Sequence, residues 1–357
     1  MTDATQRATD RLNWLRQTLG SAMLTLEPAS ADASFRSYWR THHAGQSWIV
    51  MDSPPALEDP APWLAIGQRL AAAGLHVPAV RATDLEQGFL LIEDLGSQLY
   101  LPALSEDSVD QLYGDAMDAL LRMQSAVDTT GMALYDRAFL QRELEIMPTW
   151  FLGRHLGQVL DERAQAVLAG AFEVLLESAL EQPRVFVHRD FHSRNLLRIE
   201  PHRDRHATDL RQPGDTASPT LINPGIIDFQ GALCGPITYD LASLLRDCYI
   251  AWEPERVSGW VEDYRQRLQP LRLIDASVDR TRFRRWFDLI GLQRHLKVLG
   301  IFCRLYYRDG KRGYLDDLPR VHHYVLTVAR GYPELQELVS LLQCCVGERD
   351  LGVPEGA

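Results

Sequence analysis

The chain has 357 residues, of which 46% are hydrophobic, and a formal net charge of −11. This acidic balance argues against a nucleic-acid partner, because phosphate backbones are bound by clustered Lys and Arg, and no apolar run approaches the roughly 20 residues that cross a bilayer. The five cysteines form no CxxC pair, so we expect reduced thiols, no metal site among them, and a soluble cytoplasmic protein without a membrane partner.

The first part of the chain is predicted to form a small mixed lobe over 1–96 that ends in a hinge. Its strands are indicated by short apolar runs bounded by turn residues, and its helices by apolar spacing and by Gly and Pro at their ends. In chain order we expect a helix over 7–20, strands over 35–39 and 48–51, a helix over 60–73 and a strand over 88–96.

The remainder, 97–357, is predicted to be a larger and mainly helical lobe. Residues 201–220 are rich in Asp, Arg, His, Pro and Thr and nearly lack apolar residues, so we interpret them as a flexible solvated insertion, the alternative being a substrate lid. Helical spacing predicts helices over 109–121, 164–180 and 285–307, and short apolar runs predict strands over 184–188 and 221–228.

The two short strands each end in polar residues of a particular kind. The first is followed by His-x-Asp-x-x-x-x-Asn, which contains Asp190 and Asn195, and the second ends at Asp228. Phosphoryl transfer needs a carboxylate beside the attacking hydroxyl and hard oxygen ligands for Mg²⁺ on the phosphates. The pattern therefore predicts Asp190 as the catalytic base and Asn195 and Asp228 as Mg²⁺ ligands. The alternative is that all three are ordinary polar residues at strand ends.

Three further residues of this loop have open interpretations. His188 is expected to brace the loop rather than to take part in the reaction. His192 could face the transferred phosphate or the solvent. Arg194 could stabilise charge near the phosphate or form a surface ion pair.

These motifs are similar to those of the aminoglycoside phosphotransferase superfamily, which has a bilobal, protein-kinase-like α+β fold. Residues 235–249, 292–302 and 307–311 resemble segments of the bacterial anomeric amino-sugar kinases, the N-acetylmuramate/N-acetylglucosamine kinases of peptidoglycan recycling. The resemblance implies ATP and Mg²⁺ as cofactors, transfer of a phosphoryl group to the anomeric hydroxyl to give a sugar 1-phosphate, and no obligate protein partner. It also implies that Asp240 braces the catalytic loop through backbone N–H groups, the alternative being a helix N-cap.

The expected nucleotide lobe departs from the kinase pattern in two places. The loop 29–36, which contains Ser34, has no glycine, although small side chains still let a backbone approach phosphate. The strand 48–52 has no lysine to hold the α- and β-phosphates. We hypothesise that Arg36 or Arg40 supplies this charge, the alternative being that both are exposed strand residues. The joint from Glu93 to Leu95 is expected to meet the adenine edge with its backbone.

The sugar site has weaker signals. Arg294, Lys297, Arg304 and Arg308 share one helical face and could bind the lactyl carboxylate of N-acetylmuramate, or else pair with acids of neighbouring helices. Asp247 could bind sugar hydroxyls and Tyr249 could stack on the ring, the alternative for Tyr249 being helix packing.

Two other functions compete with a sugar kinase. An aminoglycoside phosphotransferase would favour an acidic pocket for its cationic substrates, which the basic face opposes. A nucleotide-binding pseudokinase is favoured by the missing strand lysine and opposed by the complete set of Asp190, Asn195 and Asp228.

Overall fold

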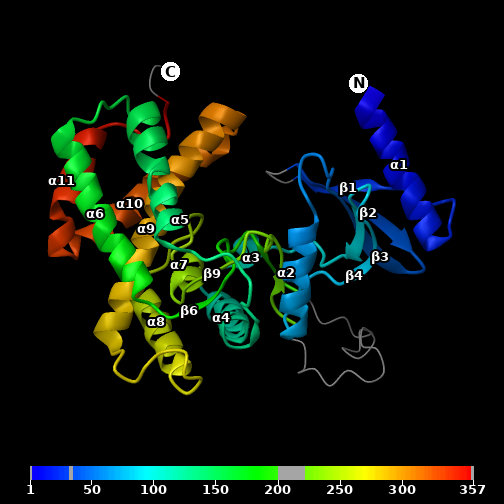
Figure 1. Cartoon of the computed structure of the whole chain (residues 1–357), viewed down its shortest axis with the longest axis horizontal. Helices are drawn as coiled ribbons and strands as arrows, with labels where there is room; N and C mark the ends of the chain where they lie inside the picture. Colours follow the sequence, from blue (N-terminus) through cyan, green and yellow to red (C-terminus); the bar gives the residue numbers. More distant parts are fainter. Residues whose placement is uncertain (1, 32–34, 200–221, 355–357) are drawn as a thin grey trace. The chain divides into compact units, whose positions relative to one another are not determined.

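The computed structural model describes residues 2–31, 35–199 and 222–354. The chain divides into two compact units (Figure 1). The first is Met1–Val127 with Arg194–Gly231, and the second is Asp128–Ser193 with Ala232–Ala357. Within the described ranges no helix is long and apolar enough to cross a membrane. The predicted insertion over 201–220 lies outside the described residues.

The first unit is built on one antiparallel sheet with strand order β1-β2-β3-β5-β4. Strands β2 and β3 form a hairpin whose two turn residues, Ala44 and Gly45, both have positive φ, at 51° and 78°. This is the turn geometry that matches the twist of a two-residue hairpin. The strands are β1 (Glu27–Ala31), β2 (Ser37–His43), β3 (Gln46–Asp52), β4 (Val80–Asp84) and β5 (Phe89–Glu93).

Helix α1 (Thr2–Leu19) covers one face of this sheet. Leu15 of the helix packs with Val50 and Leu91 of the strands in one buried cluster. Side chains alternate across a strand, so the residues on either side of Val50 point to the opposite face. The sheet therefore has one face closed by α1 and a second face available for other contacts.

The rest of the first unit surrounds that second face. Strands β7 (Leu196–Leu197) and β8 (Gly225–Ile226) form a short antiparallel pair. Helix α2 (Ala61–Ala72) contacts the segment after β8, where the rings of Trp63 and Phe229 lie 5.1 Å apart. Helices α3 (Tyr100–Ala103) and α4 (Val109–Ala126) complete the unit.

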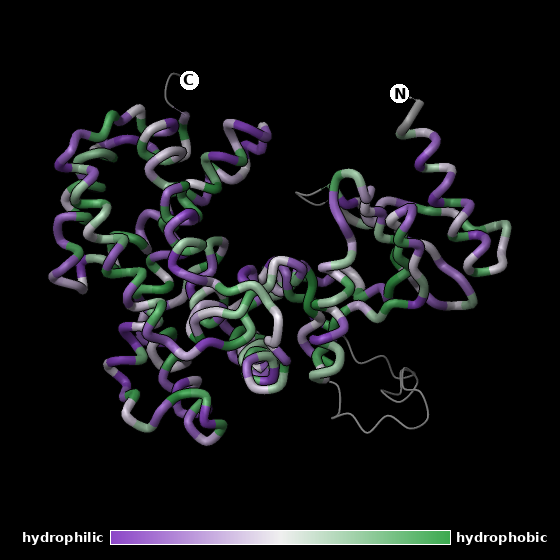
Figure 2. Tube along the Cα trace, in the orientation of Figure 1, coloured by the Kyte–Doolittle hydropathy of each residue, from purple (hydrophilic) through white to green (hydrophobic). Residues whose placement is uncertain are grey.

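The second unit is mainly helical and is organised around α9 (Arg280–Asp309), which packs against α6, α7, α8 and α10. In Figure 2 its helices alternate between hydrophilic and hydrophobic colours, as amphipathic helices do. The other elements are α5 (Arg137–Leu144), the π-helix η1 (Pro148–His155), α6 (Glu162–Leu180), β6 (Arg184–Val187), β9 (Leu233–Pro236), α7 (Tyr239–Leu245), α8 (Pro254–Leu268), η2 (Arg312–Asp317), α10 (Leu318–Arg330), η3 (Pro333–Leu335) and α11 (Gln336–Val346).

The elements agree with the predicted ones except in the strands. Strands β1 and β4 were not predicted. The strand predicted over 221–228 is reduced to Gly225–Ile226, because Pro224 has no N–H to donate to a ladder. The first compact unit extends past residue 96, since α4 and 194–231 belong to it. The functional division into lobes stays a prediction.

Candidate active site

The first unit contains a cavity of about 400 Å³ on the sheet face opposite α1. Strand alternation places Tyr38 and Arg40 of β2, and Ile49 of β3, on this face. The lining residues are Ala29, Tyr38, Arg40, Ile49, Trp63, Pro78, Ile92, Glu93, Asp94, Leu95, Gly96, Ser97, Leu99, Arg194, Asn195, Leu197, Ile227, Asp228 and Phe229. The predicted nucleotide residues Glu93, Leu95, Asn195 and Asp228 are thus brought to one cavity, whereas Ser34 lies outside the described residues.

Asn195 and Asp228 flank the β7–β8 pair and contact each other. Asn195 Nδ2 lies 3.4 Å from Asp228 Oδ2, and the Ile227 N–H donates to the Asn195 carbonyl at 3.1 Å. Asp228 has a φ of 63°, and Gln230 donates to its Oδ1 at 2.7 Å. An amide oxygen and a carboxylate this close are the hard donors that Mg²⁺ takes together with substrate phosphates and water.

Among residues 2–31, 35–199 and 222–354, no three His, Cys, Asp or Glu side chains gather at a distance that could hold a metal ion.

The two candidate arginines have different environments. Arg36 is buried, with Nε 3.2 Å from Glu58 and Nη2 3.4 Å from Asp228. Arg40 donates to Asp94 through Nε at 2.6 Å and Nη2 at 3.1 Å. The alternative of an exposed strand residue therefore does not hold for Arg36, and of the two it is Arg36 that meets a predicted metal ligand.

Two acidic residues of the hinge, Glu93 and Asp94, are each held by other protein groups. Burial raises the pKa of Asp94, but hydrogen bonds from Arg40, Ser47 and the Gly96 N–H outweigh it and lower the pKa. The Glu93 carboxylate accepts from the Ala79 N–H and lies 3.3 Å from His76 Nε2. Both carboxylates are thus engaged with protein groups, and the Glu93 N–H donates to the Ala79 carbonyl at 2.8 Å. Contact between the backbone of 93–95 and an adenine edge stays a prediction.

In the second unit the loop around Asp190 is braced from α7. Asp240 is fully buried and accepts the His188 N–H at 2.6 Å and the Arg189 N–H at 3.0 Å. His188, also fully buried, accepts the Asp190 N–H on Nδ1 at 3.3 Å. The N-cap of α7 is Thr238, so the N-cap alternative for Asp240 does not hold. These contacts support the predicted bracing roles of His188 and Asp240.

Asp190 is surrounded by cations. Burial alone would raise its pKa, but the charges of Lys297, His192, Arg294 and Arg189 lower it. A carboxylate that stays ionised can accept a hydrogen bond from a hydroxyl and then its proton. His192 is nearly buried, with its ring 5.5 Å from that of Tyr249, so the alternative of a solvent-facing His192 does not hold.

The residues of the predicted basic face of α9 have different environments along the helix. Lys297 and Arg294 are buried, with Lys297 Nζ 2.8 Å from Glu143 and Arg294 Nη1 3.3 Å from Cys248 Sγ. Arg308, near the helix end, pairs with its neighbour Asp309. The Lys297 contact matches the ion-pairing alternative, because Glu143 belongs to α5.

Glu143 is a residue that sequence reasoning missed. Besides Lys297 it pairs with Arg189 at 2.5 Å and accepts a hydrogen bond from Tyr135. Burial raises the pKa of Glu143, but Lys297 and Arg189 lower it overall. No local pattern marks this residue, since its partners are distant in the chain.

The two predicted sugar-binding residues after α7 also have protein partners. Asp247 accepts the backbone N–H and the hydroxyl of Ser193 on Oδ2, and the Tyr249 N–H on Oδ1 at 3.1 Å. Both carboxylate oxygens are thus used within the protein. The predicted role of Asp247 in binding sugar hydroxyls has no support in this geometry.

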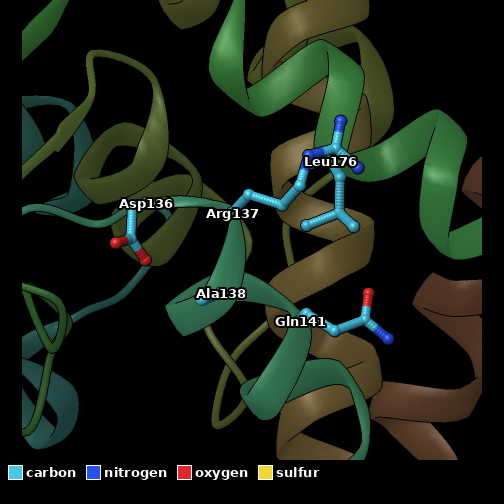
Figure 3. Close-up of a pocket in the computed structure, with 5 residues that line it drawn as sticks. All are labelled: Asp136, Arg137, Ala138, Gln141 and Leu176. Carbon is cyan, nitrogen blue, oxygen red and sulfur yellow. The ribbon is translucent and has the colours of Figure 1, made fainter.

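A second hollow, of about 500 Å³, lies between α5 and α6 (Figure 3). Asp136 caps α5 by accepting the Phe139 N–H, and Arg137 pairs with the exposed Glu173. These contacts are those of a helix start and a surface ion pair, and we assign no function to this hollow.

Comparison with known proteins decides the family. Residues 25–204 and 222–282 match the model of the phosphotransferase enzyme family APH. The chain belongs to this family. Membership confirms the predicted reaction class, phosphoryl transfer, and the bilobal α+β fold expected from the resemblance.

Curated relatives span almost the whole chain. A Pseudomonas putida protein named N-acetylmuramate/N-acetylglucosamine kinase is 43% identical over 318 residues, covering 89% of this chain and 87% of the relative. A Neisseria meningitidis protein of the same name is 37% identical over 352 residues, covering 97% and 98%. The apo structure of a thermostable mutant of the aminoglycoside phosphotransferase APH(4)-Ia, at 17% identity, has a TM-score of 0.56 and covers 89% of this chain and 98% of its own. It shows the shared fold.

Proposed function

We propose that this phosphotransferase is an ATP-dependent kinase of N-acetylmuramate and/or N-acetylglucosamine that forms the sugar 1-phosphate in peptidoglycan recycling in the cytoplasm. The observation that carries the reaction is the complete set of Asp190, Asn195 and Asp228, with Asp190 braced and ionised by its surroundings. The acceptor sugar follows from the relatives that bear that name along nearly their full length.

The proposal assigns the nucleotide to the cavity of the first unit. The backbone of 93–95 would meet the adenine edge, and Arg36, which contacts Asp228 of the lining, would meet the phosphates. Asn195 and Asp228 would hold Mg²⁺, which supplies positive charge to the phosphate oxygens when it is bound. With Arg36 in place of the cation that β3 lacks, the missing lysine would not favour a pseudokinase.

The proposal assigns proton transfer to the second unit. Asp190 takes the proton of the anomeric hydroxyl while that oxygen attacks the γ-phosphorus, and the bond to the bridging oxygen breaks to release ADP. Lys297 and Arg294 would keep Asp190 ionised. Their buried contacts favour this role over direct binding of a lactyl carboxylate, and Tyr249 would shape the site through His192.

A sugar panel with Mg-ATP tests the function. We expect N-acetylmuramate and N-acetylglucosamine to give a glycosyl phosphate, identified by its phosphorus NMR coupling and its acid lability. Asp190→Asn should lower kcat by roughly 10²- to 10⁴-fold, the range for loss of a general base. Phosphorylation of aminoglycosides but of neither sugar would transfer the assignment to the antibiotic-modifying class. If the wild type and Asp190→Asn were equally inactive on every acceptor, the pseudokinase alternative would be favoured.

A further inference from the structure

Strand β3 has no lysine, and a buried arginine stands at the start of the neighbouring strand instead. Arg36 directly precedes Ser37, the first residue of β2, and its side chain is buried. Its Nη2 lies 3.4 Å from Asp228, which lines the cavity of the first unit. Arg36 is therefore linked to the proposed nucleotide site through Asp228.

We propose that Glu58 is a positioning residue for Arg36, and that this pair holds the donor phosphates in place of a strand lysine. The inference rests on the proposed use of ATP and adds a residue to it. Arg36 Nε lies 3.2 Å from Glu58 Oε1, and the two side chains are 3% and 26% exposed. The buried guanidinium of Arg36 is thus held in place by a carboxylate that is itself partly exposed to solvent.

Glu58 also limits how strongly Arg36 interacts with Asp228. Arg36 reaches Asp228 with a second nitrogen, Nη2, at 3.4 Å. A planar guanidinium can contact two acids through different nitrogens, which a lysine ammonium does less well. Without Glu58 the whole charge of Arg36 would be drawn to Asp228, the proposed metal ligand. The pull from Glu58 therefore keeps that carboxylate available to a cation.

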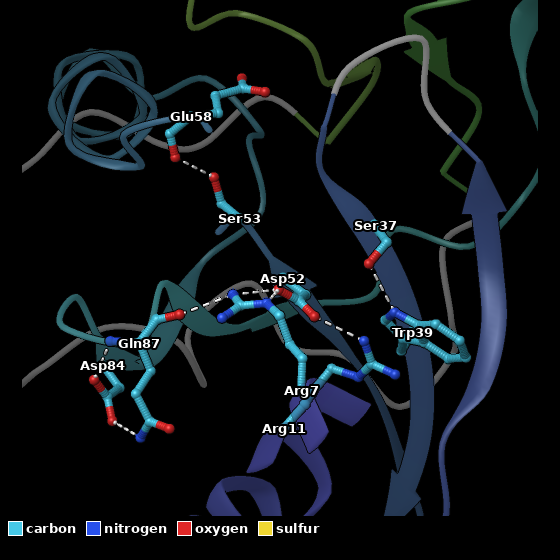
Figure 4. Close-up of polar contacts among 9 residues, drawn as sticks. All are labelled: Arg7, Arg11, Ser37, Trp39, Asp52, Ser53, Glu58, Asp84 and Gln87. Atoms are coloured by element: carbon cyan, nitrogen blue, oxygen red, sulfur yellow. Dashed lines mark hydrogen bonds and ion pairs between the residues drawn. The ribbon is translucent and has the colours of Figure 1, made fainter. Parts of the chain in front are cut away.

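The backbone around Glu58 is fixed by short contacts. Ser53 Oγ donates to the Glu58 carbonyl at 2.8 Å (Figure 4). The Glu58 N–H donates to the Pro54 carbonyl at 2.9 Å. The Ser53 N–H donates to the Gly88 carbonyl, and Gly88 has a φ of 75°. A Cβ at Gly88 would lie 1.9 Å from the Ser53 carbonyl oxygen, so only glycine allows this approach.

Helix α1 secures the start of the same loop. Arg7 and Arg11 contact the two oxygens of Asp52 at 2.5 and 2.7 Å, and the Arg11 guanidinium lies 3.8 Å from the centre of the Trp39 ring (Figure 4). Asp52 directly precedes Ser53. The negative charge of the buried Asp52 is thus balanced by Arg7 and Arg11 of α1. Glu58 and Asp228 contact Arg36 instead.

Glu58→Gln is the decisive variant, with Glu86→Gln as the matched control. Glu86 is an exposed glutamate of the same unit, so the same change there should leave kinetics unchanged. For Glu58→Gln we expect kcat/KM for Mg-ATP to fall about tenfold or more, the size of a lost charge-assisted hydrogen bond, and the sugar KM to stay within about twofold. The Kd of AMP-PNP measured without sugar should rise in parallel, and Glu58→Asp should recover part of the loss.

A double-mutant cycle with Arg36→Gln separates this idea from a structural one. If Glu58 acts through Arg36, Glu58→Gln should have little further effect in the Arg36→Gln background. Additive losses, or a Glu58→Gln protein with wild-type kinetics and AMP-PNP affinity, would overturn the inference. A wild type that phosphorylates neither sugar with Mg-ATP would instead refute the proposed function, and AMP-PNP binding would still report on the pair.

Discussion

The Asp247 carboxylate accepts both polar groups that Ser193 offers, the backbone N–H at 3.0 Å and the hydroxyl at 2.5 Å. Ser193 lies three residues after Asp190 in the chain. The same carboxylate accepts the Tyr249 N–H, and the Tyr249 ring meets that of His192 edge-on. Asp247 thus fixes the loop after Asp190, the proposed base, as Asp240 does before it.

Asp247→Asn should therefore impair turnover more than sugar binding. An amide replaces one accepting oxygen with a donor that faces an N–H, so the loop shifts. We expect kcat to fall roughly ten- to hundredfold, the usual cost of misplacing a catalytic group, with the sugar KM changed less than about threefold. Steady-state kinetics with both substrates varied measure this. Ser193→Ala should give a smaller fall in the same parameter. A raised sugar KM in Asp247→Asn, with Ser193→Ala unaffected, would restore the sugar-hydroxyl role.

The brace from Asp240 should make stability depend on pH. Burial, with a contribution from the charge of Asp190, raises the pKa of Asp240 to about 7, against the hydrogen bonds from His188 and Arg189. The folded state then binds this proton more tightly than the unfolded chain does. The stability from this group is full below about pH 4 and is lost as the pH rises through about 7.

Denaturant titrations of wild type and Asp240→Asn at several pH values between 4 and 8 measure this effect. The free energy of unfolding of the wild type should fall relative to that of the variant as the pH rises, because Asn does not titrate. Parallel pH dependence in the two proteins would show that Asp240 does not titrate in this range.

Gly300 of α9 should be the least replaceable glycine of the second unit's helices. A Cβ there would lie 2.6 Å from the backbone carbonyl of Ile146. Gly300→Ala should destabilise the protein by about 1–3 kcal/mol through overpacking. Gly170 of α6 has open space around it, so Gly170→Ala should stabilise by about 0.5–1 kcal/mol. Unfolding curves of the two variants decide this, and equal midpoints would contradict the packing argument.

The sequence predicted those features that depend on residue type and spacing. Asp190, Asn195 and Asp228 could be named as candidates because phosphoryl transfer needs these side chains at strand ends, and their roles stay predictions. Strands β1 and β4 were missed because EPASA contains proline and VRATD is largely exposed, so neither has the apolar alternation of a half-buried strand.

Partnerships across long separations could not be predicted. Glu143 lies 46 residues before Arg189 and on a different helix from Lys297, so no local pattern joins them. Glu58 was missed for the same reason, because its proposed role depends on its contact with Arg36. Helical spacing did place Arg294 and Lys297 on one face, but only packing decides whether a face meets substrate or acids of another helix.

Lys297 is one of only two lysines in the chain, and its charge lowers the pKa of Asp190, the proposed catalytic base. It is nearly buried and pairs with Glu143. Removing a neighbouring positive charge favours the protonated form of a carboxyl group. Lys297→Met should therefore raise the pKa of Asp190 and move the acid limb of the kcat profile to higher pH.

The other lysine provides the control for this prediction. Lys311→Met makes the same substitution outside the buried cluster, and its pH profile should superimpose on that of the wild type. Lys297→Arg keeps the charge and should retain most of the wild-type profile, which separates the electrostatic effect from lost packing. If kcat drops equally at every pH in Lys297→Met, with no shift of the acid limb, then Lys297 supports the fold around Asp190 without setting its ionisation.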